Sequence, residues 1–132
     1  MSADGLDAIR FDAQGLVPVV VQEAADNAVL LLAYMNRTAL DATLRTGRAH
    51  YWSRSRQKLW RKGEESGREQ LVEALYVNCE ENSLLLRVRQ QGDAACHTGH
   101  PTCYYRRLSP DSAWQEVQEQ MFDPADVYDH RL

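Results

Sequence analysis

Two apolar segments near the N-terminus, separated by one short turn, constrain the fold of this chain most strongly. Residues 16–22 and 28–35 are rich in valine, leucine and other apolar residues, and residues 24–27 between them are small or polar. Apolar runs of this length, bounded by turn residues, are typical of β-strands. The pattern therefore predicts a β-hairpin whose second strand is largely buried.

A helix is predicted directly after this hairpin. Asn36 is a favoured N-cap residue, and Leu40 and Leu44 lie four positions apart on one face of the helix that follows. Gly47 is a natural end for it, because glycine readily adopts the left-handed conformation found after helices. This is the one clear helix in the sequence.

The rest of the chain predicts further short strands joined by loops. Alternating apolar residues indicate the strands, and glycines and polar pairs mark the connections. The expected strands are 49–53, 68–78, 83–90 and a last short one from Tyr104, with a loop at 63–67 and a tight turn at Glu81 and Asn82.

These elements predict a strand-rich α+β fold formed by a single small domain. We place that domain at residues 1–108 and an acidic tail at 109–132, with a short helix over 112–120. A chain of 132 residues with 44% hydrophobic residues is long enough for one modest core. The net charge of −4 argues against a general nucleic-acid-binding protein.

Neither a secretion signal nor a membrane-spanning segment is expected. The first residues carry no basic start followed by an apolar run, and the longest apolar run, 28–33, is far too short to cross a bilayer. An odd number of cysteines without a secretion signal argues against a disulfide framework. We therefore expect a protein of the reducing cytoplasm.

The three cysteines give the strongest chemical signal. Cys96 and Cys103 lie close together, with His97 beside the first and His100 between them, while Cys79 stands alone upstream. Three such ligands suit tetrahedral zinc and leave its fourth position open to water, as in catalytic sites. The Cys-x6-Cys spacing is looser than that of a zinc finger, and a buried cysteine also serves as a small apolar residue. Both interpretations stay open at this point.

A zinc interpretation assigns a role to His97. Cys79 would then lie on another wall of the site or on another subunit, and zinc would lower the pKa of its water toward neutrality. His97 is placed to act as general base or acid, since an imidazole titrates near neutral pH. The alternative is a loop histidine without a role, and His100 is a weaker candidate still.

A basic segment predicts a phosphate site. Five basic residues fall within residues 54–62 of an otherwise acidic chain, interleaved with serines. Arginine binds phosphate in a bidentate manner, and serine hydroxyls and the amides of the glycine-rich loop that follows add neutral donors. The candidate substrate-binding residues are Ser53, Arg54, Ser55, Arg56, Lys62 and Ser66. The alternatives are a solvated charged face, or an RNA-binding patch in which Trp52 and Trp60 stack on bases.

Ordered sequence blocks extend this pattern over most of the chain, from about Phe11 to Arg107. The blocks are Gly15-Leu-Val-Pro-Val-Val-Val-Gln22, Ala33-Tyr-Met-Asn36, Thr46-Gly47, His50-Tyr-Trp-Ser-Arg-Ser-Arg56, Leu59-Trp60, Lys62-Gly-Glu64, Ser66-Gly67, Cys96-His-Thr-Gly99 and Cys103-Tyr-Tyr-Arg106. Through them the chain resembles the phosphoribosyl-AMP cyclohydrolase family of histidine biosynthesis.

The resemblance implies a reaction and an assembly. Members of this family hydrolyse the N1–C6 bond of the adenine ring in N1-(5-phosphoribosyl)-AMP, a small phosphorylated purine nucleotide. They form intertwined homodimers with shared zinc sites, so that Cys79 would come from one subunit and Cys96 and Cys103 from the other. His97 matches the histidine that helps to activate water, and the two phosphates of the substrate give the basic segment its target. No nucleic-acid or membrane partner is expected.

The chain departs from this family around Cys79. The usual Asp-Cys-Asp-x-Asp segment, whose aspartates bind magnesium, here has Asn78, Glu80 and Asn82 at the aspartate positions. Magnesium prefers carboxylate and water oxygens, so exchanging two carboxylates for amides removes two negative charges from the site. We predict that magnesium binds weakly here or not at all.

Two other functions remain as alternatives. A related enzyme would use the zinc centre on a different purine-like or cyclic amidine substrate. A non-enzymatic dimer would hold zinc structurally, or bind RNA through its basic segment with an affinity that falls steeply with salt.

Overall fold

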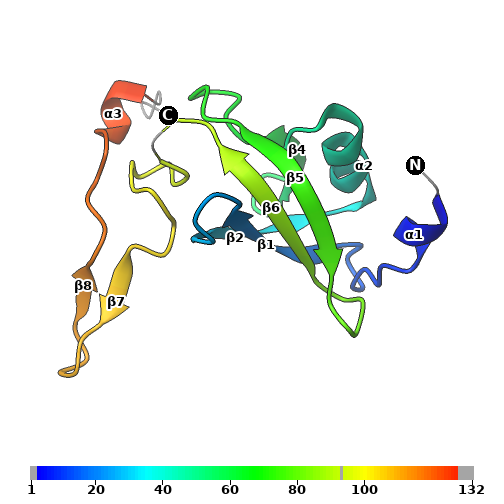
Figure 1. The fold of residues 1–132 in the computed structure, drawn as a ribbon, viewed down its shortest axis with the longest axis horizontal. Coiled ribbons are helices and arrows are strands. Elements are labelled where there is room, and N and C mark those ends of the chain that lie inside the picture. The colour runs from blue at the N-terminus through cyan, green and yellow to red at the C-terminus, as the bar shows by residue number, and fades with distance from the viewer. Residues whose placement is uncertain (1–2, 93, 128–132) are drawn as a thin grey trace.

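A computed structural model describes residues 3–92 and 94–127 of the chain (Figure 1). The described residues form eight short strands and three helices, and only one of the helices exceeds two turns. In chain order they are α1 (Ala3–Asp7), β1 (Val17–Glu23), β2 (Val29–Met35), α2 (Arg37–Thr46), β3 (His50–Ser53), β4 (Lys58–Arg61), β5 (Gln70–Val77), β6 (Leu84–Gln90), β7 (Arg106–Leu108), β8 (Trp114–Glu116) and α3 (Pro124–Val127). The predicted strand-rich α+β class is confirmed.

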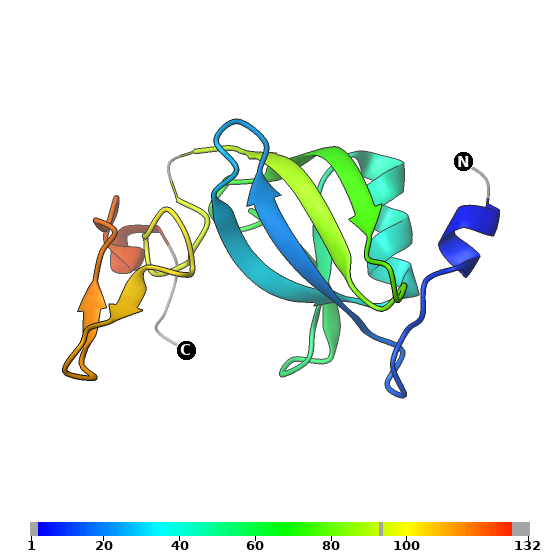
Figure 2. The ribbon, with the colours of Figure 1, turned by 60° about the horizontal axis from the view of Figure 1, so that its bottom comes forward.

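One four-stranded sheet organises the molecule, in the order β2-β1-β6-β5. Strand β1 pairs antiparallel with β2 and parallel with β6, and β5 pairs antiparallel with β6. The β1–β2 and β5–β6 pairs are hairpins between neighbouring strands, whereas β1 and β6 join through the intervening segment that contains α2 and the β3–β4 hairpin (Figures 1 and 2). The predicted N-terminal hairpin and the strand over 83–90 are confirmed.

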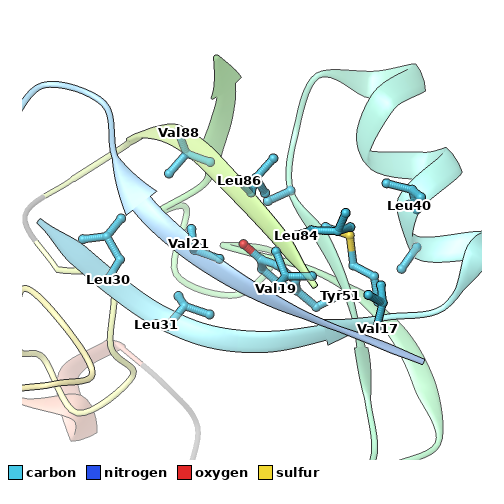
Figure 3. Packing of buried hydrophobic residues seen from close by; sticks show 14 of the residues in the cluster. Val17, Val19, Val21, Leu30, Leu31, Leu40, Tyr51, Leu84, Leu86 and Val88 are labelled. Atoms are coloured by element: carbon cyan, nitrogen blue, oxygen red, sulfur yellow. The ribbon is translucent and has the colours of Figure 1, made fainter. Parts of the chain in front are cut away.

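The core lies on one face of this sheet, because the strands alternate between buried and exposed side chains. Val17, Val19 and Val21 of β1 are fully buried, as are Leu86 and Val88 of β6 (Figure 3). Successive side chains of a strand point to opposite faces, so these residues share the face that packs against α2 and β3.

Helix α2 closes this core and has the predicted ends. The Asn36 side chain accepts a hydrogen bond from the amide of Ala39 at 2.8 Å, which satisfies a free donor of the first turn. Gly47 follows the last turn with φ of 72°, and its amide donates to the Thr43 carbonyl at 3.0 Å. The side chain of Leu40, on the helix face that was predicted to be apolar, is fully buried in the core.

A chain of polar side chains, two buried and one half-buried, links β3 to the sheet. The Tyr51 hydroxyl donates to Oε1 of Gln70 at 2.5 Å, and Nε2 of Gln70 donates to Oε1 of Gln90 at 2.8 Å. Burial raises the pKa of Tyr51, so its hydroxyl stays a neutral donor. Hydrogen bonds of this kind contribute about 1 kcal/mol each and fix the position of β3 against β5.

The opposite face of the sheet exposes an apolar row, which we call the outer row. Leu32, Val20, Leu85 and Tyr76 pair successively across β2, β1, β6 and β5 and therefore share one face. Leu32 and Tyr76 are 48% and 54% exposed, and Val20 is 36% exposed. An apolar row that crosses a whole sheet is unusual on the surface of an isolated chain.

The C-terminal part corrects two sequence predictions. The helix expected over 112–120 is wrong: residues 114–116 form β8, which pairs antiparallel with β7, and the last short strand begins at Arg106 rather than at Tyr104. The β7–β8 hairpin crosses the boundary placed after residue 108, and α3 lies further along the tail. Within the described residues, no helix is long and apolar enough to span a membrane.

The sequence also missed β4. Residues 58–61 were assigned only to a basic segment, but they pair with β3 in the register Tyr51 to Trp60 and His50 to Arg61. The rings of Tyr51 and Trp60 lie 5.3 Å apart and anchor the hairpin to the core.

Candidate metal and substrate site

The loop after β6 brings Cys96 and Cys103 together. The amide of Cys96 donates to the His100 carbonyl at 3.2 Å, and the amide of Gly99 donates to the Cys96 carbonyl at 2.9 Å. The amide of Cys103 donates to the carbonyl of Leu30, at the start of β2, at 2.7 Å. These bonds fold residues 96–103, the thiol loop, onto one end of the sheet.

A hydrogen bond between the two thiols shifts the pKa of each in opposite directions. Cys96 is buried and Cys103 is exposed. Hydrogen bonds from the Cys103 thiol and from the Thr98 hydroxyl, the latter at 3.0 Å, lower the pKa of Cys96 to about 5. The same hydrogen bond to Cys96 raises the pKa of Cys103. One thiolate at neutral pH is therefore favoured here, and thiolates are the form in which cysteine binds metals.

Lys62 lies near enough to the thiol pair to interact with it electrostatically. It follows β4, and burial lowers the pKa of its ammonium group, while Cys103 and Cys96 oppose that shift. A cation at this position offsets the negative charge of a thiolate. The sequence grouped Lys62 with the phosphate-binding residues, and that role stays a prediction.

The histidines of the thiol loop have different surroundings. His97 is exposed next to Cys96, in reach of solvent and of small molecules. His100 is buried, stacks on the Tyr105 ring at 3.6 Å between ring centres, and shares a 2.7 Å hydrogen bond through Nδ1 with the Thr98 hydroxyl. The exposed histidine is therefore the one available for proton transfer, and the buried one supports the loop.

The C-terminal tail packs over the thiol loop. Nε2 of Gln120 donates to the Thr98 carbonyl at 2.6 Å, and the amide of Met121 donates to the Gly99 carbonyl at 2.7 Å. Gly99 has φ of 90°, and a Cβ there would collide with the carbonyl oxygen of Phe122. Glycine at this position thus permits both the loop turn and the close approach of the tail.

Cys79 lies at the opposite end of the sheet from this pair. It follows β5 in the β5–β6 turn, whereas the thiol loop follows the far end of β6 (Figures 1 and 2). The seven residues of β6 separate the two ends by roughly 20 Å at the rise of an extended strand. Within the described residues, no three His, Cys, Asp or Glu side chains gather as a metal site.

Hydrogen bonds of asparagine side chains stabilise the turn around Cys79, and among the described residues no cluster of carboxylates is present there to bind a cation. Oδ1 of Asn78 accepts hydrogen bonds from the amides of Asn82 and Ser83 at 2.9 and 3.0 Å, and its Nδ2 donates to Oδ1 of Asn82 at 2.7 Å. Both amide oxygens are thus already hydrogen-bond acceptors, and Glu80 is exposed. These residues do not fit a magnesium site within this turn.

The serine and arginine residues of the basic segment meet in the β3–β4 turn. The Ser53 hydroxyl accepts from the amide of Arg56 at 3.2 Å and lies 3.4 Å from the Ser55 hydroxyl. The Arg54 guanidinium stacks 3.9 Å from the ring centre of Tyr34. Four of the six predicted substrate-binding residues are therefore grouped at one turn.

The glycine-rich loop differs from the predicted phosphate cradle. The amide of Gly67 donates to the Gly63 carbonyl at 2.7 Å, and the hydroxyl of Ser66 accepts from the amide of Arg68 at 3.1 Å. These groups close the loop on itself. A role for Ser66 with substrate remains a prediction.

A pocket of about 360 Å³ lies beside the β3–β4 turn, and the sequence did not reveal it. Three separate segments form its walls, so no local pattern marks it. It is lined by Asp12, Gln14, Leu16, Tyr34, Trp52, Arg54 and Gln57.

Thr98 is a second residue that the sequence analysis missed. Its hydroxyl contacts both the Cys96 sulfur and the His100 ring, so it links the thiol pair to the buried histidine of the loop. Its position between two histidines in the Cys-His-Thr-Gly-His segment is the one signal that marked it.

Paired thiols beside a histidine can bind a metal ion, and an arginine-rich turn can bind phosphate, so these groups suit a metal-dependent hydrolase of a phosphorylated compound. A family model described as phosphoribosyl-AMP cyclohydrolase matches residues 31–105, which include both cysteines of the thiol loop, Cys79 and the β3–β4 turn. The chain belongs to this family, as the sequence blocks predicted.

Curated relatives match over nearly their whole length. A phosphoribosyl-AMP cyclohydrolase of Methanococcoides burtonii is 49% identical over 93% of this chain and 98% of its own. Relatives of the same name from Azoarcus sp. and Nitrosospira multiformis are 46% and 47% identical, and cover 96% and 99% of this chain and 97% and 100% of their own lengths.

Proposed function

We propose that this protein is a zinc-dependent cyclohydrolase that opens the adenine ring of N1-(5-phosphoribosyl)-AMP at the N1–C6 bond. Membership of the family supports the reaction, and the name of its relatives gives the substrate. The thiol loop, with one thiolate favoured and an exposed histidine beside it, supports the zinc.

The position of Cys79 carries the proposal that two subunits share each zinc site. Two thiols leave tetrahedral zinc short of a third protein ligand, and the third cysteine of the same chain lies at the other end of β6. A second copy of the chain brings another Cys79, and a twofold arrangement would satisfy two such sites at once. Cys96 and Cys103 would thus act with Cys79 of the partner subunit.

The outer row supports this assembly. Leu32, Val20 and Tyr76 are exposed and Leu85 is half-buried, so the outer row is an apolar strip across all four strands that a second copy would bury. Homodimer interfaces are more apolar than other protein surface, which suits this strip. Residues around the strip, including Tyr34 two positions after Leu32 on β2, would then lie at the edge of the interface.

The reaction assigns roles to residues of the thiol loop and its surroundings. Zinc, when bound by the cysteines, would polarise a water molecule and make it acidic enough to lose a proton near neutral pH. His97, exposed beside Cys96, takes that proton as water adds to C6 of the ring. The C6–N1 bond then breaks, the proton passes to N1, and C6 becomes a carboxamide carbon.

Subunit mixing tests the shared site. Cys79→Ala and Cys96→Ala should each be inactive alone, because each removes one ligand from both sites of the dimer. In a mixed dimer one site loses both ligands and the other regains all three. Random pairing makes half of the dimers mixed, so about a quarter of the wild-type activity should return. If no activity returns although mixed dimers are shown by mass spectrometry, the shared site is wrong.

Magnesium should be dispensable for this chain. The side-chain amides of Asn78 and Asn82 hydrogen-bond to each other and to the backbone of the turn. The turn therefore needs no cation, whereas a cluster of carboxylates would need one to offset their mutual repulsion. We expect added magnesium to change kcat/KM of the zinc-loaded protein by less than about twofold. The double variant Asn78→Asp/Asn82→Asp is the matched control.

That control places two carboxylates where the amides now meet at 2.7 Å. Like charges at this distance repel, so the variant should be less stable without magnesium and recover thermal stability when it is added. A wild-type protein that requires magnesium for turnover would contradict the prediction.

A further inference from the structure

The pocket beside the β3–β4 turn lies on the Cys79 side of the molecule. Tyr34 is near the end of β2 and pairs with Pro18 at the start of β1, which Leu16 directly precedes. The start of β1 pairs in turn with the start of β6, so these residues lie at the same end of the sheet as Cys79. The amide of Arg10 donates to the Glu81 carbonyl at 2.7 Å, which ties the segment before β1 to the Cys79 turn. The thiol loop is at the other end.

The walls of the pocket suit one arm of a phosphorylated nucleotide. Trp52 and Tyr34 offer aromatic surface, and Gln14 and Gln57 offer amide groups. Arg54, held over the Tyr34 ring, offers the planar donors that match a phosphate monoester. Within the part of the chain that the structure describes, no carboxylate is paired with Arg54, so its charge is available to an anion.

Asp12 has a structural role in this pocket. Its Oδ1 accepts hydrogen bonds from the amides of Gln14 and Leu16, both at 2.9 Å, and so shapes the turn that forms one wall. A volume of about 360 Å³ is at the small end of ligand pockets. The pocket therefore accommodates a ribose phosphate but not a complete nucleotide with two ribose phosphates.

We propose that this pocket binds one phosphoribosyl arm of the substrate, with Arg54 over Tyr34 as its phosphate anchor, and that it serves the zinc site to which its own Cys79 contributes. The inference rests on the proposed function. In the dimer, one subunit holds the substrate by this arm while the thiol loop of the partner subunit supplies the reacting centre. Tyr34, Trp52 and Arg54 thereby determine specificity for a phosphorylated ligand.

Direct binding tests the pocket without requiring turnover. Ribose 5-phosphate, titrated into the zinc-loaded protein by calorimetry, should bind, and Arg54→Ala should weaken that binding by at least about tenfold. Arg54→Lys keeps the charge but loses the planar group, and should bind less tightly than wild type. Arg45→Ala removes an equal charge from an exposed position on α2 and should not change binding. Equal affinity of wild type and Arg54→Ala would overturn the assignment.

Subunit mixing then tests which half of the site the pocket serves, at substrate concentrations well below the KM of Arg54→Ala. Mixed with Cys96→Ala, Arg54→Ala should regain activity, because one site of the mixed dimer has an intact thiol loop, Cys79 and pocket. Mixed with Cys79→Ala, it should regain none, because each site then carries one defect. The reverse pattern would overturn the proposed side of the pocket. Failure of Cys79→Ala to complement Cys96→Ala would instead refute the shared zinc site.

Discussion

Cys96→Ala is expected to lose zinc and to reduce kcat/KM by roughly 1,000-fold or more. Cys96 is the buried thiol of the thiol loop, and hydrogen bonds from Cys103 and Thr98 lower its pKa, which favours the thiolate form that binds metals. Without it, zinc no longer lowers the pKa of the attacking water, which in bulk water lies many units above neutrality. Zinc content by atomic absorption and turnover by absorbance, on the same preparation, measure both effects.

Cys79→Ala is the informative companion to this variant. Cys79 lies at the opposite end of β6 from Cys96 in the same subunit. If two subunits share each zinc site, Cys79→Ala should nevertheless lose zinc just as Cys96→Ala does. Circular dichroism should show a folded protein in both variants, since Cys79 is exposed and Cys96 lies in a loop outside the sheet. Full zinc content in Cys96→Ala would remove Cys96 from the site.

His97→Ala should keep its zinc and lose turnover, with kcat reduced by about 100- to 10,000-fold. His97 is exposed beside Cys96, and among the described residues it takes no part in the backbone hydrogen bonds that hold the thiol loop, so removing its ring should leave the cysteines in place. The expected loss is in kcat rather than in KM, because proton transfer is needed after the substrate is bound.

Chemical rescue separates proton transfer from a structural role. Because His97 is exposed, imidazole added to His97→Ala should reach the vacated position and restore part of the lost rate. A variant with a disturbed loop would lose zinc and would not respond to imidazole. Unchanged turnover in His97→Ala would assign the proton transfer to another group.

Local signals allowed much of the fold to be predicted. The hairpin over residues 16–35 and helix α2 depend on neighbouring residues: the turn between two apolar runs, the Asn36 cap and the Gly47 stop. The helix predicted over 112–120 was wrong because Trp114 there pairs with Leu108 across a hairpin, a contact that local spacing does not reveal. Strand β4 was missed because its charged residues masked the pairing of Trp60 with Tyr51.

The candidate site likewise has one part that local sequence predicts and one part that depends on the tertiary fold. Cys96 and Cys103 are near in sequence, and the loop between them brings them together, so their pairing could be predicted. The separation of Cys79 depends on the direction of β6, and the pocket depends on three segments that only the tertiary fold assembles. The outer row likewise appears only when the register of four strands is known.

Ring opening of N1-(5-phosphoribosyl)-AMP by the zinc-loaded protein, followed by its ultraviolet absorbance with and without magnesium, tests the proposed function most directly. We predict turnover that does not depend on magnesium, as the amide-stabilised turn of Asn78 and Asn82 requires. No turnover in either condition, with zinc bound and the dimer intact, would contradict the proposed reaction and indicate a different substrate for the same centre.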